Sequence, residues 1–230
     1  MAQYIISIII PVLNEAAIIQ STLKNLLSYP DVEVIVVDGK SQDSTLSIAR
    51  TAGVRTIVVL GGRSVQMNAG AEIASANILL FLHVDTNLPT NFVELIIQTL
   101  KQPKTIAGAF ELGIEGKDRS LRWIEILVKM RSHLFSLPYG DQAIFITKQV
   151  FTELGGFSQI PIMEDFELIQ RLKSRGQIAI APGKVVTSGR RWQKLGVWKT
   201  TLVNQLVIAG YYLGISPNKL NRFYRNRGKK

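Results

Sequence analysis

Two polar side chains follow a long apolar run in the segment FLHVDTN at residues 81–87. His83 and Asp85 are two positions apart, and this spacing places both side chains on one face at the end of a strand. Imidazole and carboxylate groups are both ligands for divalent cations such as Mn²⁺. The segment therefore indicates either a metal site or a strand end that carries two polar residues.

Two more candidate ligand groups follow neighbouring apolar runs. Asp38 comes directly after EVIVV and can accept a hydrogen bond from a base or a ribose, although the next residue, Gly39, is also typical of a turn. Arg63 follows two glycines, and its planar guanidinium suits the oxygens of a diphosphate, with a plain surface charge as the alternative. Because ligands of parallel sheets bind beyond the carboxyl ends of the strands, the shared position of these residues favours binding.

The first half of the chain alternates between strand-like and helix-like patterns. Apolar, β-branched runs predict strands at residues 4–11, 33–38, 54–60 and 77–85. Helical spacing and capping residues predict helices at 14–30, 43–52, 63–75 and 90–101. This order predicts an α/β fold with a mostly parallel sheet and helices on both faces.

The second half is more mixed. We predict strands at residues 105–114, 142–148 and 178–182, and helices at 121–135, 164–175 and 197–213. His133 lies on the first of these helices and is interpreted as structural. The last helix has an apolar stripe, which predicts packing on the core, with a membrane-surface helix as the alternative. The stripe consists of Trp198, Leu202, Leu206, Ala209 and Leu213.

Composition and charge limit the classes of partner. The chain has 230 residues and no cysteine, which excludes disulfides and thiolate metal sites and fits a reducing cytoplasm. No acidic residue follows Glu167, whereas 14 Lys and Arg do, and the first 167 residues hold 13 basic and 17 acidic side chains. This asymmetry predicts an anionic partner for the C-terminus, namely phosphates, an acidic membrane or nucleic acid, with an unpartnered basic tail as the alternative.

Glycine-rich nucleotide motifs are missing where they would be needed. The first predicted strand is followed by PVLNEA, so the G-x-G-x-x-G turn of dinucleotide-binding folds is absent, and no P-loop sequence occurs. Nucleotide binding here would therefore depend on the carboxylates and the arginine at the strand ends.

Five segments in this order resemble the family 2 glycosyltransferases, which have the GT-A fold. The segments are SIIIPVLNE, VIVVDGKSQDST, RSVQMNAGAEIASANILLFLHVDT, GGF and MEDFEL, and the similarity covers residues 5–176. More narrowly, LFLHVDT, PIMEDFEL and RRWQKLGVWKTT are similar to a small single-domain group linked to arsenosugar biosynthesis. The resemblance implies one Rossmann-like GT-A domain at 1–190, with a nucleotide-binding half at 1–102, an acceptor half at 103–190, and a basic helical C-terminal extension at 191–230.

The resemblance also implies roles in binding a nucleotide sugar and a metal. Asp85 matches the second carboxylate of the family's D-x-D motif, which binds a divalent metal, Mn²⁺ or Mg²⁺, at the diphosphate; His83 replaces the first and is the second candidate ligand. The nucleotide-binding residues implied in this way are Pro11, Asn14, Glu15, Asp38, Arg63 and Asn68.

In the acceptor half, Asp165 matches the family's catalytic base and Glu164 stands beside it. Acidic residues at a helix N-terminus also complement the helix dipole, which is the structural alternative. Asp141 and Gln142 follow a Pro-Tyr-Gly turn. They either face the sugar or the acceptor, or they belong to a plain turn without a role in binding. Two further residues match the Arg-Trp part of a motif that contacts acceptor and diphosphate in processive relatives, namely Arg191 and Trp192.

We therefore expect a metal-dependent, inverting transfer of a sugar from a UDP- or GDP-linked donor to a hydroxyl acceptor, either a small molecule or lipid-linked. The expected location is the cytoplasm, either free or attached peripherally to the inner face of the membrane through the basic C-terminus. One alternative is a metal-dependent nucleotidyltransferase, although such enzymes carry a basic, glycine-rich loop where this chain has PVLNEA. The other is a basic nucleic-acid- or membrane-binding module; the acidic front half and the absence of a recognition motif argue against nucleic acid.

Overall fold

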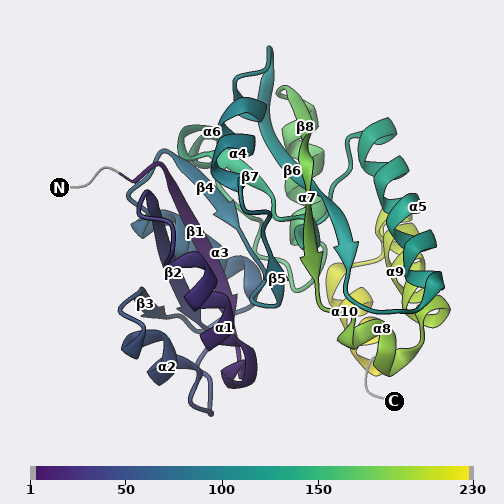
Figure 1. Ribbon diagram of the computed structural model, residues 1–230. Helices are drawn as coiled ribbons and strands as arrows, with labels where there is room; N and C mark the ends of the chain where they lie inside the picture. Colours follow the sequence, from purple (N-terminus) through teal and green to yellow (C-terminus); the bar gives the residue numbers. More distant parts are fainter. Residues whose placement is uncertain (1–3, 228–230) are drawn as a thin grey trace.

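The computed structural model describes residues 4–227 and has an α/β architecture (Figure 1). The N-terminal half alternates as the sequence predicts. Its elements are β1 (Ile6–Val12), α1 (Ala16–Leu26), β2 (Val32–Asp38), α2 (Thr45–Thr51), β3 (Arg55–Val58), α3 (Arg63–Ile73), β4 (Ile78–Phe81), β5 (Thr86–Asn87) and α4 (Phe92–Leu100).

The remaining elements alternate less regularly. They are β6 (Thr105–Ile114), α5 (Arg119–Phe135), the 3₁₀ turn η1 (Gly140–Gln142), β7 (Phe145–Thr147), α6 (Lys148–Glu153), α7 (Glu164–Lys173), β8 (Gln177–Thr187), α8 (Arg190–Leu195), α9 (Val197–Tyr212) and α10 (Pro217–Arg227).

One sheet runs through both halves, in the order β3-β2-β1-β4-β7-β6-β8-β5. Strands β1 to β4 are parallel neighbours, as are β6 and β8, whereas β7 pairs antiparallel with both β4 and β6. Because β1, β2 and β4 are parallel, their carboxyl ends meet at one edge of the sheet. This edge carries Asp38 and the segment that contains His83 and Asp85.

Alternating side chains of the strands build a core on each face of the sheet. On β1, Ile8 and Ile10 face a cluster that includes residues of α1, α4 and α5, whereas Ile9 faces a second cluster with residues of α3, α6 and α7. All three of these isoleucines are fully buried. The near-continuous apolar strands thus reflect a sheet that is covered on both sides, as predicted.

The C-terminal helices attach through a third, smaller cluster. Met163 and Phe166 of the α7 region pack with Val207 of α9 and Leu220 of α10. In Figure 1, α8, α9 and α10 lie together beyond the edge of the sheet, beside α5. The part of the chain that we predicted as an extension is therefore packed against the acceptor half.

Three sequence predictions need correction. The strand predicted at 77–85 ends at Phe81, because the chain turns at residues 84–85 to enter β5. The strand predicted at 178–182 extends to Thr187, because β8 pairs with β6 along its length and then with β5. The apolar stripe on α9 does not pack on the core: Trp198, Leu202 and the rest are exposed, and the opposite face of the helix is buried instead.

Candidate functional site

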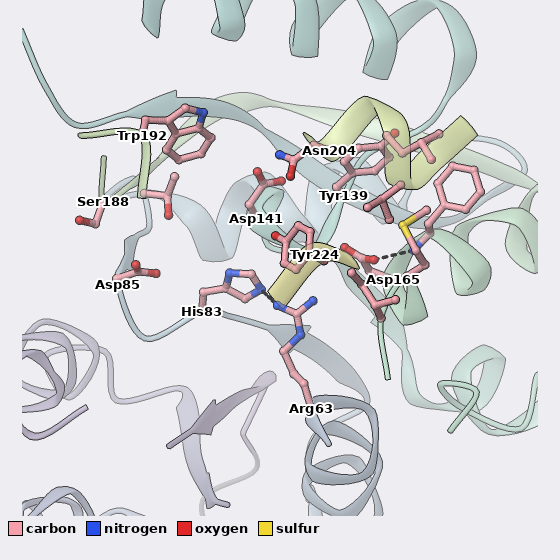
Figure 2. Close-up of a pocket in the computed structure, with 16 residues that line it drawn as sticks. Arg63, His83, Asp85, Tyr139, Asp141, Asp165, Ser188, Trp192, Asn204 and Tyr224 are labelled. Carbon is pink, nitrogen blue, oxygen red and sulfur yellow. Dashed lines mark hydrogen bonds between the residues drawn. The ribbon is translucent and has the colours of Figure 1, made fainter. Parts of the chain in front are cut away.

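A cavity of about 360 Å³ lies between the edge of the sheet and the C-terminal helices (Figure 2). This volume is typical of a site for a small organic ligand. It is lined by Arg63, His83, Asp85, Tyr139, Asp141, Ile162, Met163, Asp165, Phe166, Thr187, Ser188, Trp192, Asn204, Val207, Ile208 and Tyr224. Six residues that the sequence singled out thus come to one place from distant segments.

Two buried polar atoms in this lining have no hydrogen-bond partner within the described part of the chain. They are Oδ1 of Asp141 and Nε1 of the Trp192 indole. Buried polar groups in folded proteins are nearly always paired, because an unpaired one costs desolvation free energy. Their place in the cavity is consistent with a polar ligand that supplies the missing partners.

A chain of polar contacts connects α3, the segment after β4 and α7. Arg63 Nε lies 2.6 Å from Glu164 Oε1, and Arg63 Nη1 lies 2.9 Å from His83 Nε2. Glu164 is buried and its carboxylate is committed to this ion pair. Glu164 therefore positions the Arg63 guanidinium at the cavity. Figure 2 shows Arg63 beside His83.

The imidazole of His83 is neutral at physiological pH. Burial, together with the adjacent Arg63 guanidinium, lowers the pKa of His83 to about 4. Because arginine only donates hydrogen bonds, Nε2 of His83 must accept from Arg63, and the single ring proton is then on Nδ1. In this arrangement neither ring nitrogen has a free lone pair for a metal ion.

Asp85 is also paired. Its Oδ2 lies 3.1 Å from Nη2 of Arg190, at the start of α8, and the same nitrogen lies 3.8 Å from Glu15 Oε2. Burial raises the pKa of Glu15, against the opposing effect of Arg190. Arg190 thus connects the start of α1 with the segment after β4, and it places a second cation next to the cavity.

These residues fit a divalent metal only as part of a site shared with a ligand. Among residues 4–227, no three His, Asp or Glu side chains come close enough to hold an ion by themselves. Asp85 offers carboxylate oxygen, and Mg²⁺ or Mn²⁺ is often held by one or two carboxylates plus the phosphate oxygens of a substrate. The donor chemistry is therefore suitable at Asp85, provided that a diphosphate supplies further oxygens.

On the opposite wall, the Asp165 carboxylate is fixed by two backbone amides. The N–H of Gly140 donates to Oδ2 at 2.6 Å, and the N–H of Phe166 donates to Oδ1 at 2.8 Å. A Cβ atom on Gly140 would lie only 2.8 Å from Asp165 Oδ2, so the glycine permits this close approach. The carboxylate is thus held in one orientation at the cavity.

Asp141 and Gln142 lie next to each other in η1 but differ in their surroundings. Asp141 lines the cavity, and burial raises its pKa, against the opposing effect of Arg131. Gln142 is fully buried: its amide oxygen accepts from Arg131 and Ser132, and its nitrogen donates to the Phe110 carbonyl. The prediction that Gln142 faces a sugar or an acceptor finds no support in this geometry, because its amide is already bonded within the core.

Asp38 ends β2 with only one of its carboxylate oxygens bonded. Oδ1 accepts from the Ser41 amide at 2.7 Å, whereas Oδ2 is buried without a partner in the described structure. Pro11, from β1, borders a small hollow next to the cavity together with Arg63, His83 and Asp165. Both positions are compatible with the predicted contacts to a nucleoside.

Asn14 and Asn68 serve the backbone around the site. The Asn14 amide oxygen accepts from the N–H of Gln42, which holds the loop after β2 against the loop after β1. Asn68 donates to the carbonyl of Phe157 and accepts from its N–H, both at 2.8 Å. The Asn68 amide is therefore occupied in tying α3 to the segment after α6.

The sequence did not single out several residues at the cavity, and most of them lie on the C-terminal helices. The side chain of Arg191 lies outside the described residues, but its neighbour Arg190 contacts Asp85, and the RRW motif was the available signal. Tyr139 lies in the Pro-Tyr-Gly turn, under the Arg131 guanidinium at 3.4 Å from the ring centre. Asn204 and Tyr224 reach the cavity from α9 and α10, and no motif marks either of them.

Known proteins share both sequence and fold with this chain. A model described as glycosyl transferase family 2 matches residues 7–160, which is more than half of the chain. The chain belongs to glycosyl transferase family 2. A PGL/p-HBAD biosynthesis glycosyltransferase of Mycobacterium tuberculosis is 38% identical over 97 residues, covering 38% of this chain and 38% of that protein. The family 2 chain thus aligns with well under half the length of this curated relative.

Solved structures with the same fold include two proteins with bound nucleotide sugars. The mannosyltransferase PcManGT of Pyrobaculum calidifontis, in complex with GDP-Man and Mn²⁺, has a TM-score of 0.68 at 18% identity and covers 96% of this chain and 73% of that one. S. aureus TarS, in complex with UDP-GlcNAc, has a TM-score of 0.64 at 16% identity and covers 80% of this chain and 58% of that one. These likenesses confirm the predicted GT-A fold of the family 2 chain.

Proposed function

We propose that this family 2 chain transfers a sugar from a nucleotide donor to a hydroxyl acceptor, with inversion at the sugar carbon and Asp165 as the base. One observation carries the proposal: the backbone-held carboxylate of Asp165 faces the same cavity as Arg63 and Asp85. A base and groups for a leaving diphosphate are the parts that such a transfer requires.

In this mechanism Asp165 accepts the proton of the acceptor hydroxyl. The hydroxyl oxygen attacks the sugar carbon, the bond from that carbon to the diphosphate breaks, and the electron pair leaves with the diphosphate oxygen. One carboxylate base is sufficient for inversion, since no covalent intermediate forms. Because Gly140 and Phe166 fix the carboxylate, little reorientation is needed when the acceptor arrives.

The negative charge that develops on the diphosphate needs cationic partners. Arg63, held by Glu164, is the first, and Arg190 is the second within reach of the site. Asp85 would hold a divalent ion together with the diphosphate, and such an ion acts as a Lewis acid on the leaving group. Neutral His83 orients Arg63 in this scheme.

The fold neighbours support a class of donor, and the charge of the C-terminus supports a location. The fold neighbours hold GDP-Man or UDP-GlcNAc, which supports a GDP- or UDP-linked donor, with Asp38 and Pro11 toward the nucleoside. None of the helices formed by residues 4–227 has the length and apolar character needed to cross a bilayer. We propose peripheral attachment to an anionic membrane, supported by the 14 basic and no acidic side chains after Glu167.

A thermal-shift panel tests donor binding. UDP, GDP and their sugar conjugates are added with and without Mn²⁺, and the melting temperature Tm is measured. At about 100 times its Kd, a ligand stabilises the folded state by about 2.7 kcal/mol, which corresponds to several degrees in Tm. No shift with any nucleotide would contradict the proposal, whereas release of pyrophosphate from a nucleoside triphosphate would favour a nucleotidyltransferase.

Asp165→Asn tests the base. We expect transfer to fall by about 10²- to 10⁴-fold, because the amide cannot take the acceptor proton, while the Tm shift with the donor nucleotide is kept. The matched control is Asp31→Asn, the same change in an exposed loop far from the cavity, which should transfer sugar at the wild-type rate. Wild-type activity in Asp165→Asn would remove Asp165 from the mechanism.

A further inference from the structure

Helix α5 turns an apolar stripe away from the protein. Trp123, Leu127 and Leu134 are 62%, 55% and 68% exposed, and Ile126 and Met130 lie between them with about half of their surfaces exposed. Residues three and four positions apart share one face of a helix, so these side chains form a continuous stripe. The opposite face of α5 is buried through Leu121 and Ile124. Isolated exposed apolar residues are normal, but a whole helix face of them marks an interaction surface.

Helix α9 has a second stripe of the same kind. Trp198, Leu202 and Leu206 are 67%, 60% and 49% exposed, and Leu213 directly after the helix is 80% exposed. The two helices contact each other and lie on the same side of the molecule, beyond β6 and β8 (Figure 1). We use the name outer face for these two stripes, namely Trp123, Ile126, Leu127, Met130 and Leu134 of α5 with Trp198, Leu202, Leu206 and Leu213 of α9.

Cations outnumber carboxylates around the outer face, where Glu111 of β6 pairs with Lys129 and His133 of α5. Glu125 is the only acidic residue of α5, and it is buried and paired with Arg122. Helices α8, α9 and α10 contain no acidic residue. Exposed cations lie on α5 and α9, namely Lys129 and Lys199, and on α8 and α10, which both contact α9, namely Lys194, Lys219, Arg222 and Arg225. Apolar stripes with tryptophan, framed by Lys and Arg, are the chemistry of helices that lie in the surface of an anionic bilayer.

We propose that the outer face of α5 and α9 seats this protein on the surface of an anionic lipid bilayer. The apolar side chains enter the boundary of the acyl chains, and the surrounding Lys and Arg pair with lipid phosphates. A second protein copy would meet the same cations with its own, which disfavours self-association through this face. Attachment thus depends on two folded helices and not only on the basic C-terminus.

The outer face is next to the cavity. Helix α9 lines the cavity with Asn204, Val207 and Ile208 and turns Leu202 and Leu206 outward. A bilayer seated on these leucines therefore lies one helix away from the site. On the basis of the proposed function, this placement assigns a lipid-linked hydroxyl compound as the acceptor class.

Vesicle co-sedimentation tests the inference. The full chain is mixed with vesicles of equal parts phosphatidylcholine and phosphatidylglycerol, or with vesicles of phosphatidylcholine alone. We expect binding to the mixed vesicles that weakens with salt, and much weaker binding to the neutral ones. The double variant Leu127→Gln/Leu202→Gln should bind at least about tenfold more weakly, since two exposed leucines no longer enter the bilayer.

The control makes the same Leu→Gln change at a position outside the outer face. Leu27→Gln removes a half-exposed leucine at the end of α1, outside the outer face, and should bind vesicles like the wild type. Failure of the wild type to bind mixed vesicles, or full binding by the double variant, overturns the inference. A wild-type dimer that dissociates in the double variant, measured by sedimentation velocity without vesicles, would assign the outer face to a second copy and overturn it as well.

Thermal shifts with UDP and GDP on the same proteins separate the two proposals. We expect the double variant to keep the nucleotide-induced Tm shift of the wild type, because neither leucine lines the cavity. Vesicle binding without any nucleotide shift would leave the membrane surface intact and remove the proposed function and its acceptor. A nucleotide-induced Tm shift without vesicle binding would support the proposed function and overturn the membrane surface.

Discussion

At the scale of single residues, the site is a set of paired charges in which each partner fixes the other. Glu164 forms an ion pair with Arg63, and Arg63 donates a hydrogen bond to Nε2 of His83. Arg190 forms an ion pair with Asp85. Carboxylates and a histidine next to a cavity would suggest a preformed metal site, but these side chains are already bonded to Arg63 and Arg190. Ligand binding therefore has to compete with, or reuse, these ion pairs.

The first prediction concerns the protonation of His83. Its NMR titration should give a pKa of about 4, and Arg63→Gln should raise this pKa, since the guanidinium next to the ring disfavours a second positive charge. His83→Gln assigns the signal, because His133 is the only other histidine. A His83 pKa near 6.5 in the wild type would contradict the half-buried, Arg63-bound geometry.

The same pKa predicts a pH dependence of stability. An unfolded histidine has a pKa of about 6.5, so between pH 6.5 and 4 the unfolded chain binds the proton and the folded chain does not. His83 therefore does not reduce the free energy of unfolding above pH 6.5, and it lowers this free energy as the pH falls from 6.5 toward 4. Urea unfolding at several pH values should show a shallower decline in His83→Gln than in the wild type; parallel curves would refute this prediction.

Gly140→Ala tests how closely Asp165 has to be placed. The new Cβ would lie 2.8 Å from Asp165 Oδ2 and 3.4 Å from His83 Nε2, so the carboxylate must shift. We expect kcat to fall by about 10- to 100-fold with little change in Tm, because a displacement of this size disturbs alignment but not folding. Gly62→Ala is the control, since its Cβ would meet no atom within 4 Å; equal effects of the two changes would argue against the predicted role of Gly140.

At the scale of elements, close packing of α3 on the sheet sets the position of Arg63. Gly70 lies on the face of α3 toward β1 and β2, and Arg63 begins the same helix. A Cβ at Gly70 would lie 2.5 Å from Ile9 and 2.9 Å from Val37, both of which are fully buried. The helix can approach the strands this closely only with glycine at that position.

Gly70→Ala should destabilise the fold. Overpacking of about 1–3 kcal/mol outweighs the gain in helix propensity of about 1 kcal/mol. Ile9→Ala alone should also destabilise, by about 2–5 kcal/mol, and the double variant should lose less than the sum, because the smaller residue 9 makes room for the new methyl group. Urea unfolding of the four proteins measures this coupling, and strict additivity would show that the two sites do not touch.

At the scale of the whole molecule, the C-terminal helices complete the cavity. Helices α9 and α10 pack on α7 through Phe166, Val207 and Leu220, and Tyr224 of α10 lines the cavity. The acceptor side of the site thus depends on a small apolar cluster at the end of the chain. Loss of that cluster should affect binding as well as stability.

Leu220→Ala tests this dependence. Leu220 is 4% exposed, so the truncation should cost about 2–3 kcal/mol and loosen α10. We expect a lower Tm and weaker acceptor binding than in Leu213→Ala, where the same change falls on a residue that is 80% exposed. Matching Tm values in the two variants would show that α10 is not held by this cluster.

Sequence reasoning found most of the scaffold and part of the site. The alternation of helices and strands and the two-sided sheet follow from periodicity, and the candidates Arg63, His83 and Asp85 follow from their places at strand ends. Asp165 was a candidate through the family resemblance. Gln142 was selected on its position after a turn, but its burial depends on Arg131 and Phe110, which the local sequence does not show. Its role could therefore not be predicted from the turn alone.

The sequence by itself determines which residue types stand at the strand ends, because hydrophobic periodicity fixes where each strand begins and ends. Only the tertiary structure decides which of these charges meet, since Arg63–Glu164 and Arg190–Asp85 join residues about a hundred positions apart. It also decides which face of α9 is buried. That helix has apolar residues on both faces, so its own sequence cannot select one; contact with α7 and α10 buries Val207 and leaves Leu202 exposed.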